Sequence, residues 1–202
     1  MLVAHPPSRG GPFGVFVRQG RQHEALLDHE VMLALAIPEV EEALDGLLER
    51  RIGRAPEAEG DLQAVDDVLR RYEGELDGKV VIDITNPVDT ETYAPLSIEA
   101  GSVAQEIAAR VPGAKVVKAF NTTFAGTLVE GQVAGEELDV LLASDDEEAK
   151  NVVSRLASEG GMRPIDAGSL ALAHNLEALS YLHMTIQPTL GTNYGSAFKV
   201  LA

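Results

Sequence analysis

Two short polar segments follow apolar, β-branched runs in the middle of the chain. Residues 82–87 read IDITNP, and residues 117–123 read VKAFNTT. Asn86 and Asn121 each carry an amide that both donates and accepts hydrogen bonds, so each can hold a carboxamide or a carbonyl group of a ligand. The same residue types also form turns and cap helices. Because they recur at the ends of two successive predicted strands, the pattern favours a ligand site at one edge of a sheet.

A glycine-rich segment near the start, residues 9–14 (RGGPFG), is the nearest candidate for a phosphate-binding loop. Gly11 and Gly14 complete a G-G-x-x-G pattern, and such glycines let backbone N–H groups approach a pyrophosphate at a helix N-terminus. Two prolines just before the segment cannot donate the hydrogen bonds of a central strand. The segment is therefore either a divergent cofactor loop or a flexible loop, and both alternatives stay open.

The last helical segment, residues 170–187, carries His183 and Met184. His183 falls on an apolar stripe at helical spacing that runs from Leu176 to Ile186. That position fits a buried core histidine as well as a ligand contact. Met184 suits the flat face of a ring, because its thioether is soft and polarizable. The other histidines show no metal-ligand spacing and the chain has no cysteine, so the sequence predicts no metal site.

From residue 64 onward, helical and strand-like segments alternate, and the strands are apolar nearly throughout. This is typical of a parallel sheet with helices on both faces. We therefore predict an α/β fold with a doubly wound, mostly parallel sheet, at least four parallel strands within residues 64–202, and Asn86 beside Asn121. The expected strands are residues 78–89, 114–123, 138–145 and 162–168, and the expected helices are residues 64–76, 102–113, 125–129, 147–161 and 170–187, the last stopped by Pro188.

The first 63 residues are less regular. Residues 29–51 offer either a strand followed by a helix or one broken helix, and residues 53–61 resemble a polar linker. The sequence thus predicts a divergent amino-terminal segment over residues 1–63, in which the first βαβ unit is atypical or missing. Residues 64–202 form the predicted α/β domain with its carboxyl-terminal helix.

Composition restricts the partners of the protein. The formal net charge of −16 argues against nucleic acid or an anionic membrane as a partner, because phosphate contacts require clustered Lys and Arg. No segment is long and apolar enough to span a bilayer, and the start of the chain lacks the order of a signal peptide. The absence of cysteine agrees with a reducing compartment. We expect a cytoplasmic protein whose partners are a small-molecule cofactor and substrate.

Five segments occur in an order that resembles the F420-dependent NADP reductases, over about residues 64–202. The resemblance implies a Rossmann-like sheet that binds NADP, with coenzyme F420 as a possible second cofactor. Glycine-rich residues 9–14 depart from the fingerprint of that family. The segments are LDGKVVIDITNPVD, VVKAFNTTFAGTL, LLASDDEEAK, RPIDAGSL and LEALSYLHMTIQ. By this resemblance Thr85, Asn86, Pro87, Ala119, Phe120, Asn121 and Thr122 lie at the nicotinamide, and His183 and Met184 line the deazaflavin or a dimer surface.

The resemblance implies an oxidoreductase that transfers a hydride between NADP(H) and a deazaflavin or similar acceptor. Two alternatives stay open: a non-catalytic relative that has lost dinucleotide binding, and an NADPH-dependent reductase of a small carbonyl or imine. We assign no general acid or base, since hydride transfer between rings depends on orientation and exclusion of water. The apolar last helix predicts a homodimer. The poor glycine motif predicts weak NADPH binding.

Overall fold

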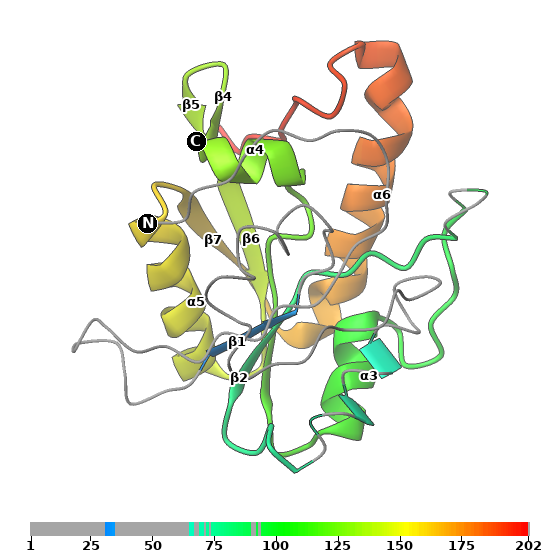
Figure 1. The fold of residues 1–202 in the computed structure, drawn as a ribbon, viewed down its shortest axis with the longest axis vertical. Coiled ribbons are helices and arrows are strands. Elements are labelled where there is room, and N and C mark those ends of the chain that lie inside the picture. The colour runs from blue at the N-terminus through cyan, green and yellow to red at the C-terminus, as the bar shows by residue number, and fades with distance from the viewer. Residues whose placement is uncertain are drawn as a thin grey trace, which may run out of the picture.

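A five-stranded sheet forms the centre of the molecule (Figure 1). The computed structural model describes residues 31–34, 65–66, 69–70, 72, 74–89, 92 and 94–201, the first of these ranges as backbone. The strands follow the order β1-β2-β3-β6-β7 across the sheet. Their bounds are β1 Val31–Ala34, β2 Val80–Asp83, β3 Lys115–Lys118, β6 Asp139–Ala143 and β7 Arg163–Gly168.

The sheet is mostly parallel, as predicted, but one pairing is reversed. Strands β1, β2 and β3 pair in parallel, and so do β6 and β7. Strand β6 meets β3 antiparallel through Lys118 and Ala143. The prediction of four parallel strands within residues 64–202 is therefore wrong. One edge of the sheet combines the carboxyl ends of β1–β3 with the amino ends of β6 and β7.

The segment between β3 and β6 explains the reversal. It holds the short helix α4 (Ala125–Glu130) and a hairpin of β4 (Gln132–Val133) and β5 (Glu136–Glu137), which the sequence analysis missed. A parallel crossover needs a connection that carries the chain back along the sheet, usually a longer helix. Here α4 and the hairpin stay at the end where β3 finishes, so β6 starts there and runs the opposite way (Figure 1).

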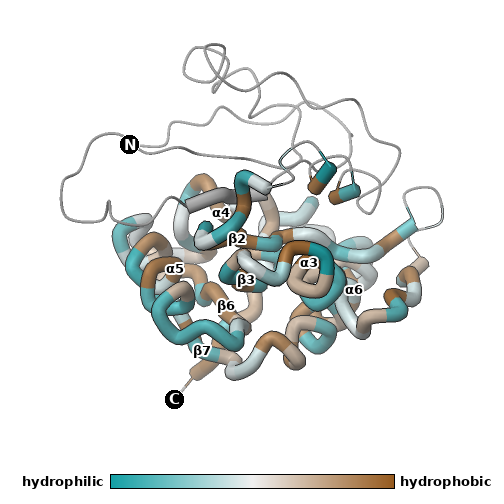
Figure 2. Tube along the Cα trace, turned by 90° about the horizontal axis from the view of Figure 1, so that it is seen from below, coloured by the Kyte–Doolittle hydropathy of each residue, from teal (hydrophilic) through white to brown (hydrophobic). Residues whose placement is uncertain are grey.

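Helices cover both faces of the sheet (Figure 2). On one face, α3 (Val103–Arg110) and the start of α6 (Ala173–Leu190) pack with alternate strand residues such as Val81 and Val116. On the other face, α5 (Glu147–Glu159) packs with Ile82 and Val117. Strands β2, β3 and β6 are almost entirely buried, which is why they read as nearly continuous apolar runs. The predicted three-layer α/β arrangement is confirmed.

The last helix extends further than predicted. The predicted helix ended before Pro188, but α6 runs to Leu190 and contains this proline. The φ angle of proline is compatible with a helix, and proline removes only one backbone donor. Near the end of a helix it therefore need not end the helix. The helix ends at Gly191, whose left-handed φ of 65° suits a residue without a side chain.

Strand β1 answers one question left open by the sequence. Residues 29–51 offered a strand or a broken helix at this point, and Val31–Ala34 form a strand in register with β2. Gly11 and Gly14 lie outside the described residues, as does the expected linker. Of the helix expected over residues 64–76, the described residues Val65, Asp66, Leu69 and Arg70 are helical, and Val65 and Leu69 pack in the core. The division of the chain at residue 63 stays a prediction.

Within the described part of the chain, no helix has the length and apolar character needed to cross a membrane.

The carboxyl-terminal tail is bound to the sheet through Asp139, the first residue of β6. Arg163 of β7 donates to both carboxylate oxygens of Asp139, at 2.8 and 2.7 Å. The Val200 amide donates to the same group at 2.7 Å, and Lys199 Nζ lies 3.0 Å from it. Burial alone raises the pKa of Asp139, but the donors from Arg163, Val200 and Lys199 outweigh it and lower the pKa to about 2.

We expect Asp139→Asn to destabilise the protein at neutral pH and to have less effect in acid. The folded-state pKa lies below the ordinary value of 3.8, so the ionised group contributes about 2 kcal/mol above pH ~4, and this is lost as the pH falls toward ~2. Urea unfolding at a series of pH values measures the difference. Glu130→Gln, an exposed change on α4, is the control. A loss that stays constant down to pH ~2 contradicts the ionic role of Asp139.

Candidate functional site

Asn86 and Asn121 lie side by side at the edge of the sheet, as predicted. Asn86 Nδ2 donates to the Asn121 carbonyl at 3.0 Å, and Asn121 Nδ2 donates to Asn86 Oδ1 at 3.0 Å. Both side chains are buried. Ser180 of α6 donates to the same Asn121 carbonyl at 2.7 Å. Three elements, β2, β3 and α6, therefore converge on one pair of amides.

One atom of this pair is left without a partner. Asn121 Oδ1 is buried and accepts no hydrogen bond from the described residues. The orientation of the Asn121 amide is set by its Nδ2 donor bond to Asn86. Leaving a buried acceptor unsatisfied costs about 1–3 kcal/mol, so such atoms are uncommon outside functional sites. A ligand N–H donor, such as that of a carboxamide, matches what this oxygen lacks.

The backbone just before Asn121 is strained. Phe120 has φ of 61°, in the left-handed region that residues other than glycine seldom adopt. Thr123 Oγ1 donates to the Phe120 carbonyl at 2.6 Å and holds the turn. Conformations of this kind cost about 1–3 kcal/mol and gather at binding and active sites. The turn places Asn121 next to Asn86 instead of letting β3 continue.

A buried group of three charges lies close to the two asparagines, at the ends of β2 and β3. Lys118 Nζ is 2.8 Å from Asp83 Oδ2 and 2.9 Å from Glu177 Oε1, and it donates to the Thr85 carbonyl at 2.6 Å. Lys118 and Asp83 have no exposed surface, and Glu177 is 6% exposed. Burial raises the pKa of the Glu177 carboxyl, and Lys118 opposes that shift.

Asp83 also fixes the chain that leads to Asn86. Its Oδ1 accepts from Thr85 N at 2.9 Å and from Thr85 Oγ1 at 2.7 Å. Thr85 is thus held through its amide, its hydroxyl and, by Lys118, its carbonyl. In this structure Thr85 supports the site from below, while its neighbours Asn86 and Pro87 are buried in the loop that follows β2.

Asp83, Lys118 and Glu177 were not predicted as site residues from the sequence. The available signal was that Asp83 and Lys118 interrupt two apolar strands at matching places, with opposite charges. The two residues are register partners in the parallel pair β2–β3. Glu177 sits on the buried stripe of α6, between Leu176 and Ser180. Charges on buried strands and stripes are rare unless paired, so the combination was detectable.

His183 is buried at the tail side of the same edge. Its ring lies between Phe124 and Phe198, with centroid distances of 4.3 and 4.4 Å, and its Nε2 is 2.9 Å from Ser196 Oγ. Burial lowers the pKa of His183 below its usual value, and the Thr122 backbone opposes that shift. Met184, the next residue, is half-buried. The structure therefore brings His183 to the end of β3, as part of a packed aromatic group.

The other predicted contact residues on the loop after β3 are buried. Ala119 and Phe120 belong to the core cluster on the α5 side of the sheet, and Thr122 is buried beside them. Among the residues that the structure describes, no group of three His, Asp or Glu side chains is arranged to hold a metal ion.

These features define an α/β protein with a mostly parallel, Rossmann-like sheet and a polar site at the strand ends. No family model matches the sequence. The chain is 34% identical over 119 residues to the F420-dependent NADP reductase of Methanocaldococcus jannaschii, a match covering 56% of this chain and 53% of that protein. It is 38% identical over 105 residues to the metalloreductase STEAP3 of Rattus norvegicus, covering 52% of this chain and 20% of the rat protein.

A solved structure supports the same comparison. The fold resembles that of an Arthrobacter sp. FB24 protein described provisionally as an F420-dependent NADP reductase, with a TM-score of 0.62 and 29% identity. The match covers 69% of this chain and 64% of that one. The predicted fold class is confirmed. The chain is similar to F420-dependent NADP reductases, and it spans about half the length of the archaeal relative.

We expect Lys118→Met to destabilise the protein strongly. The change leaves Asp83 and Glu177 buried without a cation, and breaking a buried ion pair in this way costs about 3–5 kcal/mol. Denaturant unfolding at pH 7 measures the loss. Lys115→Met, on the same strand, is the control, because Lys115 pairs with Glu148 at the surface and its loss costs far less. Similar losses for both variants would show that the buried group does not hold the strand ends together.

Proposed function

We propose that the protein is an NAD(P)-dependent oxidoreductase of the F420-dependent NADP reductase type. In this proposal a hydride passes between NADP(H) and a deazaflavin or a similar acceptor. The observation that carries the proposal is the pair Asn86 and Asn121 at the carboxyl ends of β2 and β3, with the unsatisfied oxygen of Asn121. Similarity to two proteins named as reductases supports the redox class.

Each predicted residue has a role in this proposal. Asn86 and Asn121 bind the carboxamide of the nicotinamide, since together they offer a donor and an unsatisfied acceptor. Phe120, Thr122 and Pro87 shape the surface around them, with Thr85 and Ala119 supporting the two strand ends. The bound cofactors supply the hydride chemistry, while the residues of this chain orient the ring and exclude water.

The second cofactor and the pyrophosphate depend on other parts of the chain. We propose that Met184 contacts the deazaflavin, and that His183, enclosed by Phe124 and Phe198, lines the same side of the site. Gly11 and Gly14 remain the proposed contacts to the pyrophosphate. The proposed partners are thus a small-molecule cofactor and substrate, and the cytoplasmic location stays a prediction from composition.

We expect NADPH to bind weakly, with a dissociation constant above about 100 μM, because a poor glycine motif provides few backbone donors to the pyrophosphate. We expect Asn121→Ala to weaken binding by a further tenfold or so, since it removes the acceptor for the carboxamide. Calorimetry on the full chain measures both. Asn151→Ala, an exposed change on α5, is the matched control.

Three experimental results distinguish the proposed function from its two alternatives. Binding of NADPH with reduction of F420 supports the proposal. Binding with turnover of a small carbonyl or imine, and none of F420, favours the direct reductase. Undetectable NADPH binding by folded protein indicates a non-catalytic relative and contradicts the proposal.

We also propose that the protein is a homodimer. The outer side of α6 exposes Leu182 and Leu190, at 52% and 49%, and Tyr194 in the following tail is exposed as well. Leu182 and Leu190 lie on a helix whose opposite side already packs on the sheet, so a second copy is a suitable partner for this apolar surface.

The double change Leu182→Glu and Leu190→Glu is expected to convert the dimer to a monomer, because it places charges in the proposed apolar contact. Sedimentation velocity at micromolar protein concentration measures the change. Val129→Glu, at a similarly exposed valine on α4, is the control. A monomeric wild-type protein in the same experiment would refute the dimer.

A further inference from the structure

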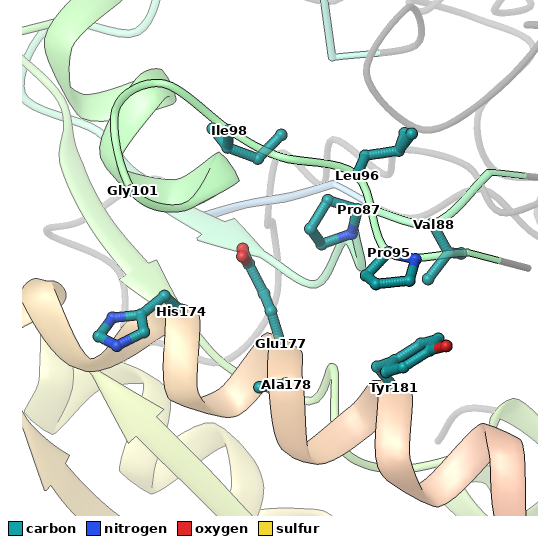
Figure 3. A pocket seen from close by; sticks show the side chains of 10 residues that line it. All are labelled: Pro87, Val88, Pro95, Leu96, Ile98, Gly101, His174, Glu177, Ala178 and Tyr181. Carbon is teal, nitrogen blue, oxygen red and sulfur yellow. The ribbon is translucent and has the colours of Figure 1, made fainter.

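A pocket of about 270 Å³ lies between the loop after β2 and the amino-terminal half of α6 (Figure 3). Its lining is largely apolar and comes from Pro87, Pro95, Leu96 and Ile98 on the loop side. The Tyr181 ring lines it from the helix side. The volume is near the lower end for small-molecule sites, so a ligand of one ring with a short substituent fits it.

Glu177 is a charged group in this apolar lining. Its carboxylate projects from α6 toward the loop side of the pocket (Figure 3). One oxygen, Oε1, accepts from Lys118 Nζ at 2.9 Å and from the Val103 amide at 3.1 Å. The other oxygen accepts no hydrogen bond from the described residues. The side chain is more than nine-tenths buried, and its second oxygen is available to a ligand in the pocket.

The charges around Glu177 do not balance when its carboxyl is ionised. Asp83 and Glu177 contribute two carboxylates, and Lys118 contributes one ammonium group. Buried charges are normally compensated by a partner, and a carboxylate in apolar surroundings attracts a cation strongly. A cation that donates an N–H to the second oxygen of Glu177 would complete the group.

We propose that this pocket binds a small organic cation, a protonated amine with an apolar body. The ammonium group donates to Glu177, and the body packs on Pro87, Pro95 and the Tyr181 ring. A neutral analogue loses the charge-assisted hydrogen bond, and an anionic analogue is repelled by the carboxylate. The inference does not rest on the proposed hydride transfer, because the pocket and its charge are defined without a dinucleotide.

Benzylamine is the probe, since it combines one ring with an ammonium group. Benzyl alcohol is its neutral counterpart, and benzoate is its anionic counterpart. Titrations of the full ¹⁵N-labelled chain, followed by NMR in the absence of NADPH, give the affinity and the residues that shift. We expect millimolar binding of benzylamine, with shifts at Leu96, Ile98 and Tyr181, and binding at least about tenfold weaker for the other two compounds.

Two variants test the site itself. Glu177→Gln keeps the size of the side chain and removes its charge, and is expected to weaken benzylamine binding about tenfold. Because Glu177 also pairs with Lys118, a second variant avoids the buried charges. Ala178→Phe places a ring in the pocket from the exposed side of α6 and is expected to abolish binding. Asn175→Phe, exposed on the same helix outside the pocket lining, is the control.

The proposal is overturned by any of three outcomes. These are equal binding of benzyl alcohol and benzylamine, unchanged benzylamine binding in folded Ala178→Phe, or no saturable shift at the pocket residues. NADPH affinity of the same variants is measured separately, so failure of this inference is distinguishable from failure of the proposed reductase function.

Discussion

The ion group of Lys118 with Asp83 and Glu177 is the interaction on which the rest of the site depends. It joins β2, β3 and α6, which are separate in sequence, through one ammonium group. Removing three charges from water is costly, and the cost is offset only when each group is well hydrogen-bonded. Here Thr85 and the Val103 amide complete the bonds. The geometry that satisfies the charges therefore also fixes where the two strands end.

The strand ends then determine the position of the amides. Thr85, held by Asp83 and Lys118, is directly followed by Asn86. On the neighbouring strand, the left-handed turn at Phe120 follows Lys118 closely and brings Asn121 against Asn86. Strain at Phe120 and the unsatisfied oxygen of Asn121 are local costs that the buried charges and the core must offset. Such costs are expected where a protein is arranged for binding and not for maximal stability.

The reversed strand β6 brings the carboxyl-terminal tail to this edge of the sheet. Since β6 begins where β3 ends, Asp139 lies at the same edge as the asparagines and there holds the tail through Val200. The tail also supplies Ser196 and Phe198 to the surroundings of His183. In an all-parallel sheet the amino end of β6 would lie at the far edge. The aromatic group and the tail are thus at the site because of the hairpin between α4 and β6.

The sequence was informative where a pattern is local and uninformative where a partner is distant. The contact between Asn86 and Asn121 was predictable, because the carboxyl ends of adjacent parallel strands share an edge. The direction of β6 was not, since it depends on the hairpin β4–β5, whose short strands leave little periodic signal. The ion group combines residues that lie as far as 94 positions apart in the sequence, from Asp83 to Glu177. Asp83 and Lys118 each interrupt an apolar strand, but the sequence does not show that Glu177 joins them.

The central claim is that Asn86 and Asn121 bind the nicotinamide end of NADPH, and their own side-chain amides give the most direct test. In ¹⁵N-edited NMR spectra each Nδ2 group gives its own pair of signals, assigned by single substitution. Titration with NADPH is predicted to shift both pairs, with ATP, which lacks nicotinamide, leaving them in place. Saturable NADPH binding that leaves both amide pairs unchanged would contradict the claim.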